Sequence, residues 1–131
     1  MSYVSISFPG TARYLSEVRM WTTKILGDVP EAADVVQIVS ELAANAVLHT
    51  ASGEEGGSFT LHIATYANRW QIRMDDHGGP TAPAVLTPAT DDEAGRGLAI
   101  VEALADAWGV VGDEYGRAVW AEVGIPEEPC T

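Results

Sequence analysis

Short stretches of alternating hydrophobic and polar residues are interspersed along this chain with longer stretches in which hydrophobic residues recur every three or four positions. The first pattern is typical of strands with one buried face, and the second is typical of amphipathic helices. We therefore expect strands near residues 3–8, 59–63, 70–74, 108–111 and 118–123, and helices near 11–25, 28–50 and 97–107. The first helix should bury the residues that share one of its sides, Leu15, Val18, Trp21 and Ile25.

The order of these elements constrains the fold. Strands on either side of Ala67 and Asn68 indicate one hairpin, and strands around residues 113–116 indicate a second. Antiparallel hairpins with helices grouped on one face are typical of an α+β protein. We expect a two-layer α/β sandwich, formed as a single domain over residues 1–131, in which a mixed, mostly antiparallel sheet carries three main helices on one face. The proline-rich residues 78–94 should form a long loop of the kind that often serves as a functional lid.

Composition and charge narrow the classes of function. The chain has 131 residues, of which 47% are hydrophobic, so one packed core is feasible. Its formal net charge of −12, from 7 basic and 19 acidic residues, argues against binding nucleic acid or an anionic membrane surface. The single cysteine, Cys130, permits no internal disulfide, and we find neither a signal peptide nor a segment of membrane-spanning length. We therefore expect a cytoplasmic protein.

The helix expected near 28–50 carries polar residues beside its hydrophobic stripe. Glu41, Asn45 and His49 follow one another at intervals of four residues, which places them in one line along the helix. Polar groups at the border of a buried face need partners. The amide oxygen of Asn45 suits Mg²⁺ beside phosphate oxygens, and the carboxylate of Glu41 suits proton abstraction from a hydroxyl or water. A solvated helix edge is the alternative interpretation of the same spacing.

A carboxylate is expected on the inner face of the sheet. Asp76 follows the strand near 70–74 at an even number of residues from Trp70, so its side chain should point to the same, inner face. Gly78 and Gly79 come soon after. A buried carboxylate needs hydrogen-bond donors, which the amino group of an adenine would provide. The glycines would let the backbone approach a flat base closely. An ordinary Asp-Gly turn is the alternative interpretation.

Glycines also precede the last expected helix, in the segment Gly95-Arg96-Gly97-Leu98. Free backbone N–H groups at the start of a helix bind anions, and the helix dipole favours negative charge there. Arg96 would add a contact to phosphate. The same glycines also suit the flexible hinge of a lid, and the two interpretations are compatible.

The remaining residues of interest indicate structure rather than chemistry. The four tryptophans fall at core positions of the pattern: Trp21, Trp70, Trp108 and Trp120. His62 alternates to the outer face of its strand, and the acidic residues 91–93 suit a solvated loop better than a metal site. The sequence contains no Walker A motif, no dinucleotide-binding glycine fingerprint and no Gly-x-Ser-x-Gly elbow.

The polar motifs occur in a set order: Glu41-Leu-Ala-Ala-Asn45, then Asp76-x-Gly78, then Gly95-x-Gly97-Leu98. In order and spacing they resemble the N, G1 and G2 boxes of the GHKL ATPases, the histidine-kinase-like superfamily, over residues 12–123. Within that superfamily the chain is most similar to the anti-sigma-factor serine kinases of the RsbW and SpoIIAB type. That similarity rests on the segments Val39-Ser-Glu-Leu-Ala-Ala-Asn-Ala-Val-Leu-His-Thr50, Gly95-Arg-Gly-Leu-Ala-Ile-Val101 and Val119-Trp-Ala-Glu122.

The resemblance implies the ATP-binding fold of that superfamily, ATP and Mg²⁺ as ligands, and a role for each matched residue. The residues implied to bind the nucleotide are Asn45, His49, Asp76, Gly78, Gly79 and the lid residues Gly95, Arg96, Gly97 and Leu98. Asn45 would coordinate Mg²⁺, and Asp76 would bind the adenine amino group. Glu41 would be the catalytic base toward a serine hydroxyl of a protein substrate. The implied partners are a sigma factor and a STAS-type anti-sigma-factor antagonist, and relatives suggest a homodimer.

One departure from the family pattern concerns the last strand. The family usually has Gly-x-Thr-Val-Trp there, with the threonine near the adenine, and this chain has alanine at that place, Ala118. Loss of the hydroxyl predicts ATP binding weaker by about 1 kcal/mol.

The sequence leaves two candidate functions. The first is an ATP-dependent serine/threonine kinase that phosphorylates an anti-sigma-factor antagonist and also holds a sigma factor. The second is a binding module that sequesters a regulatory protein with weak or no ATP binding; a stand-alone ATP hydrolase is less favoured.

Overall fold

Helices and strands follow one another in the predicted order in the structure, a computed structural model that describes residues 2–49, 57–76, 93–112 and 116–126. The elements are β1 (Ser2–Pro9), a 3₁₀ turn (Ala12–Tyr14), α1 (Leu15–Leu26), α2 (Ala32–His49), β2 (Ser58–Thr65), β3 (Arg69–Asp76), α3 (Glu93–Leu104), β4 (Ala107–Gly112) and β5 (Arg117–Gly124). Among these residues no helix is long and apolar enough to cross a membrane.

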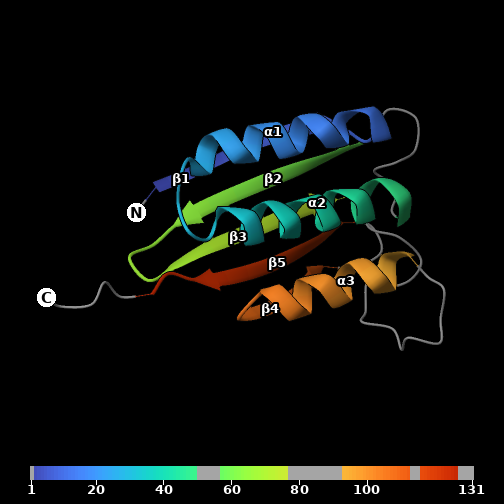
Figure 1. Ribbon diagram of the computed structural model, residues 1–131. Helices are drawn as coiled ribbons and strands as arrows, with labels where there is room; N and C mark the ends of the chain where they lie inside the picture. Colours follow the sequence, from blue (N-terminus) through green and yellow to red (C-terminus); the bar gives the residue numbers. More distant parts are fainter. Residues whose placement is uncertain (1, 50–56, 77–92, 113–115, 127–131) are drawn as a thin grey trace, which may run out of the picture.

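The strands form one five-stranded sheet in the order β1-β2-β3-β5-β4, and the three α-helices cover one face of it (Figure 1). Each neighbouring pair of strands is antiparallel, so the described sheet is wholly antiparallel rather than mixed. The α+β two-layer sandwich is thereby confirmed. The connection from β3 through α3 passes over β5 to the edge strand β4, which leaves β5 in the interior of the sheet beside β3.

The hydrophobic core lies between the inner face of the sheet and the helices. Its fully buried side chains include Ile38 and Leu42 from α2, Leu61 and Ile63 from β2, Ile72 and Met74 from β3, and Leu98 and Val101 from α3. Full burial of such a side chain stabilises the fold by about 1.5–3 kcal/mol. A slip of one residue in any strand would turn its hydrophobic set outward, so the core specifies the register of the whole sheet.

The buried side of α1 differs from the prediction. Its fully buried residues are Val18, Thr22 and Leu26, whereas Ile25, predicted to be buried, is 40% exposed. Thr22 is accommodated because its hydroxyl donates a hydrogen bond of 2.7 Å to the carbonyl oxygen of Val18, one turn earlier. A pattern of hydrophobic residues alone misses a threonine that satisfies its own polar group inside the helix.

Three of the tryptophans predicted for the core contact it: Trp21, Trp70 and Trp108. The prediction for Trp120 was wrong, because the register of β5 pairs it with Arg73 and Gly109 on the outer face of the sheet. Its ring lies over Gly109, where an added Cβ would be 2.8 Å from the indole. Hydrophobic residues occupy both parities of this strand, with Ala118 and Trp120 on one and Val119, Ala121 and Val123 on the other, so the local alternation did not distinguish its two faces.

Candidate functional site

Asn45 and Asp76 lie at the same end of the sandwich. At the other end, the indole N–H of Trp70 donates a hydrogen bond of 3.0 Å to the carboxylate of Glu31, just before α2. From this contact α2 and β3 run side by side. The 14 residue steps from Glu31 to Asn45 and the 6 residue steps from Trp70 to Asp76 both span about 20 Å, given the rise per residue of a helix and of a strand. Figure 1 shows α2 and β3 ending together on the right.

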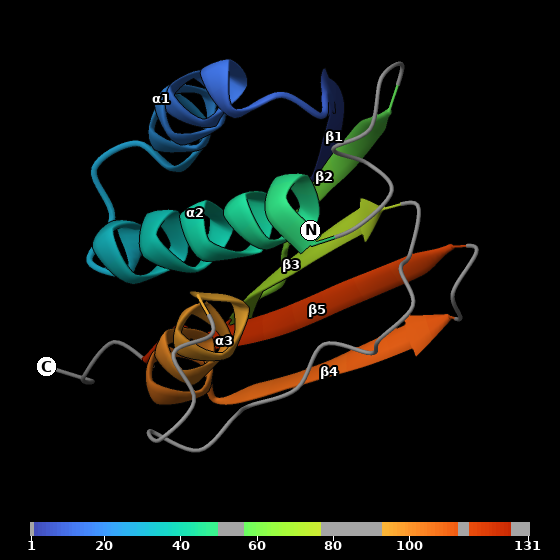
Figure 2. The same cartoon turned by 90° about the vertical axis from the view of Figure 1, so that its right-hand side faces the viewer.

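The third element of the site is α3, whose first residues lie at this same end (Figure 1). In Figure 2, which looks at the molecule from that side, α3 lies alongside α2 over the same face of the sheet. The motifs that are far apart in the sequence therefore converge on one end of the molecule. That end is formed by the last turns of α2, the end of β3 and the first turn of α3.

Asn45 carries a buried polar atom of the kind that binds a ligand. Its side chain is 6% exposed. Among the residues that the structure describes, its Oδ1 is the one buried side-chain nitrogen or oxygen atom without a hydrogen-bond partner. A buried carbonyl oxygen without a partner destabilises a protein by about 1–3 kcal/mol. Side-chain amide oxygens are ligands for hard cations such as Mg²⁺, so this atom fits the cation that the sequence motif implied.

Glu41 lies one turn before Asn45 on the same side of α2. Its Oε1 accepts a hydrogen bond of 2.8 Å from the side-chain amide of Gln37, a further turn earlier, and the pair is partly buried. The bond restrains the carboxylate one turn from Asn45. Gln37 was missed by the sequence motif, although its spacing of four residues from Glu41 was a usable signal. A carboxylate held in this way can accept a proton from a hydroxyl group that approaches this end of the sandwich.

Asp76 is on the inner face of β3, as predicted, and is 9% exposed. Its register partner on β5 is Arg117, which is 6% exposed. Direct cross-strand partners share one face of a sheet, so Arg117 is the β5 residue beside Asp76. Ala118 pairs with Asp75 on the outer face. Position 118 thus has the opposite parity to position 117, and the predicted effect of Ala118 on ATP binding stays a prediction.

The start of α3 also differs from the prediction. The helix begins at Glu93 instead of Gly97 and ends at Leu104 instead of 107, so Gly95 and Gly97 lie inside its first turns. The side chain of Leu98 belongs to the core, and the helix includes both glycines in spite of their low helix propensity. The first four N–H groups of an α-helix lack an acceptor within the helix, and that of Gly95 is among them.

Several residues implied to bind the nucleotide remain predictions. His49 is the last residue of α2 and Arg96 lies in α3, but their side chains, together with Gly78 and Gly79, lie outside the described residues.

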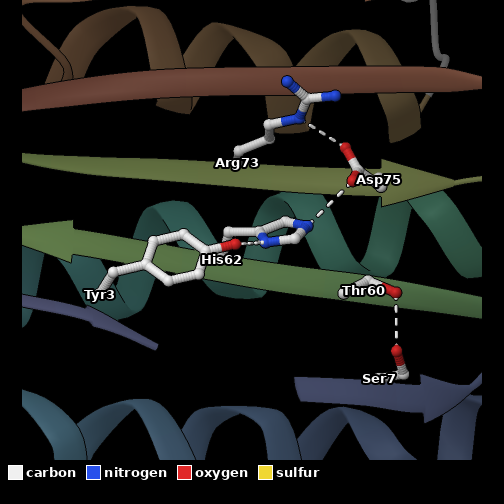
Figure 3. A network of polar contacts seen from close by, with 6 residues as sticks. All are labelled: Tyr3, Ser7, Thr60, His62, Arg73 and Asp75. Carbon is white, nitrogen blue, oxygen red and sulfur yellow. Dashed lines mark hydrogen bonds and ion pairs between the residues drawn. The ribbon is translucent and has the colours of Figure 1, made fainter. Parts of the chain in front are cut away.

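The outer face of the sheet carries a polar network that the sequence did not predict (Figure 3). The Tyr3 hydroxyl bonds to Nδ1 of His62, and Nε2 of His62 bonds to Asp75 at 2.9 Å. Asp75 also accepts a hydrogen bond of 2.6 Å from Nε of Arg73. The network links β1, β2 and β3 beside a hollow of about 360 Å³. Exposed ion pairs contribute at most about 1 kcal/mol. Because it faces away from Asn45 and Asp76, we assign the network to sheet stability.

The fold and this set of groups define an α+β domain with one end suited to a cation and a nucleotide. Residues 8–122 match the model of the family described as histidine kinase-like ATPase domain, and the chain belongs to that family. This membership agrees with ATP binding at the end that holds Asn45 and Asp76.

A solved structure has the same fold. It contains the RsbU and RsbW domains of Rv1364c from Mycobacterium tuberculosis, and it matches with a TM-score of 0.70 at 20% sequence identity. The match covers 94% of this chain and 32% of that one, so this chain spans about a third of its length. A search of curated proteins found no match.

Proposed function

We propose that this chain is an anti-sigma-factor-type regulator that binds Mg²⁺–ATP and phosphorylates a serine or threonine of an anti-sigma-factor antagonist. The observation that carries the proposal is the unpartnered Oδ1 of Asn45, one turn from the carboxylate of Glu41. A cation ligand and a base beside one another are what phosphoryl transfer to a hydroxyl group requires.

In this proposal each residue of the site has its own role. Asn45 would hold the cation through its amide oxygen, and bound Mg²⁺ would neutralise the charge of the phosphates. Glu41 would accept the proton of the substrate hydroxyl as that oxygen attacks the terminal phosphorus. Asp76, at the end of β3, would accept a hydrogen bond from the adenine amino group. The start of α3 would bind phosphate oxygens through backbone N–H groups.

The partners of the proposed kinase are proteins of the cytoplasm. We propose a STAS-type antagonist as the substrate and a sigma factor as the protein that the chain holds when the antagonist is phosphorylated. The RsbW domain named in the similar structure supports this class of partner. The net charge of −12 fits a regulator that acts through proteins and not by binding DNA. We propose that the domain forms a homodimer.

A second function, a binding module with weak or no ATP binding, is favoured by one observation. Arg117 is buried beside Asp76. A guanidinium there can occupy the carboxylate oxygens that an adenine amino group needs. In that case the domain would bind its regulatory partner without a nucleotide.

Transfer of labelled phosphate distinguishes the two functions. The chain is incubated with Mg²⁺, ATP labelled at the terminal phosphate, and STAS-type antagonist proteins, while calorimetry measures ATP binding separately. We expect label on a serine or threonine of an antagonist. Glu41→Gln should reduce the transfer rate by about 100-fold or more, as loss of a general base does, and should leave ATP affinity nearly unchanged. Glu17→Gln, an exposed substitution on α1, is the matched control and should transfer normally.

Each failure has a separate meaning. ATP binding without transfer to any antagonist would favour the binding module. Full transfer by Glu41→Gln would remove the base assignment and keep the kinase. Absence of ATP binding by the wild-type chain would refute the nucleotide site itself.

A further inference from the structure

Two charged side chains, Asp76 and Arg117, are buried in the described part of the chain. They are direct register partners at the end of the β3–β5 ladder. The Cβ atoms of such partners are about 4.5–5.5 Å apart. Charged side chains are almost never fully buried unless their charge is matched. The end of the sheet therefore holds a negative and a positive group side by side on the face that the helices cover.

The chemistry of these two groups is complementary to one edge of adenine. A carboxylate accepts hydrogen bonds only, and a guanidinium donates only, through five N–H groups. The edge of adenine has an amino group, which donates, next to ring nitrogen N1, which accepts. This inference rests on the ATP site proposed above. We propose that Arg117 determines base recognition: Asp76 accepts a hydrogen bond from the adenine amino group, and Arg117 donates one to N1.

The other described arginines of the sheet have different surroundings. Arg73 and Arg69 lie on the outer face, where Nε of Arg73 bonds to Asp75 at 2.6 Å and Nε of Arg69 bonds to Glu122 at 2.8 Å. Exposed ion pairs of this kind are common on protein surfaces and do not indicate a ligand site. Arg73 is therefore a matched control for Arg117, because it is the same residue type, near the same end of the sheet, with the opposite parity.

The experiment removes the acceptor from the ligand and the donor from the protein, singly and together. Calorimetry measures the affinity of the full chain for ATP, for 1-deaza-ATP, in which a C–H group replaces N1, and for 7-deaza-ATP as the ligand control. The proteins are the wild type, Arg117→Met, Arg117→Lys and Arg73→Met. For the wild type and for Arg73→Met, we expect 1-deaza-ATP to bind at least tenfold more weakly than ATP, the loss expected for a hydrogen bond to a charged group. Replacement of N7, in 7-deaza-ATP, should change the affinity little.

Arg117→Met should bind ATP about as weakly as the wild type binds 1-deaza-ATP, and it should not distinguish the two ligands. Arg117→Lys keeps a charged donor and should keep part of the preference for ATP. Circular dichroism reports whether each variant is folded. If Arg117→Met does not fold, the proposal is still tested by the ratio of the wild-type affinities for ATP and 1-deaza-ATP and by the same ratio for Arg117→Lys.

Three results would overturn the proposal. The first is equal binding of ATP and 1-deaza-ATP by the wild type. The second is a tenfold preference for ATP that survives in Arg117→Met. The third is tighter ATP binding by Arg117→Met, which would mean that the guanidinium competes with adenine for Asp76. Absence of any ATP binding by the wild type is a different result, because it refutes the proposed function and removes the site on which this inference rests.

Discussion

Replacement of Asn45 by leucine should stabilise the ligand-free protein and abolish its stabilisation by Mg²⁺–ATP. Leucine has the same branched shape as asparagine, so the substitution at this buried position leaves no cavity. It removes the unpartnered Oδ1, whose burial destabilises the protein by about 1–3 kcal/mol. We expect a gain in stability at the lower end of this range, because the substitution removes the side-chain amide nitrogen as well. A gain of about 1 kcal/mol raises Tm by roughly 3–5 °C in a domain of this size.

Thermal unfolding followed by circular dichroism, with and without Mg²⁺–ATP, measures both effects. At 100 times its Kd, the ligand should stabilise the wild-type chain by about 2.7 kcal/mol and the Asn45→Leu variant not at all. Asn68→Leu is the control, because Asn68 is exposed and its Oδ1 already accepts a hydrogen bond of 3.0 Å from Arg69. The control should gain no stability and should respond fully to the ligand.

Two outcomes would refute the reasoning. A lower Tm for ligand-free Asn45→Leu would mean that Oδ1 has a partner in solution. An undiminished response of the same variant to Mg²⁺–ATP would mean that the cation is held elsewhere.

Two further substitutions test the fold that positions the site. Gly109→Ala should lower the free energy of unfolding in urea by about 1–3 kcal/mol, because the added Cβ would be 2.8 Å from the ring of Trp120; an unchanged midpoint would contradict the placement of that indole over β4. Glu31→Ala should destabilise by about 1–2 kcal/mol, because the partly buried indole N–H of Trp70 loses its acceptor at 3.0 Å. Unchanged stability of Glu31→Ala in the same assay would show that the contact does not anchor α2 to β3.

Periodicity located the described helices and strands within a few residues, because each buries one face and the period of that face is local information. It failed where both parities of a strand are hydrophobic, as at Trp120, and where a polar residue is buried by bonding within its own helix, as at Thr22. The start of α3 was misplaced for a related reason. Glycine lowers helix propensity locally, but core packing of Leu98 and Val101 outweighs it.

The line of Glu41 and Asn45 on one helix and the inward direction of Asp76 were determined by the sequence alone, since each depends on spacing within one element. What these groups face was decided only by the tertiary structure. The register between β3 and β5 joins residues 76 and 117, which are far apart in the chain, and a shift of one position would bring Ala118 in place of Arg117 beside the carboxylate. Packing of the whole inner face against the helices sets that register, and no local segment contains it.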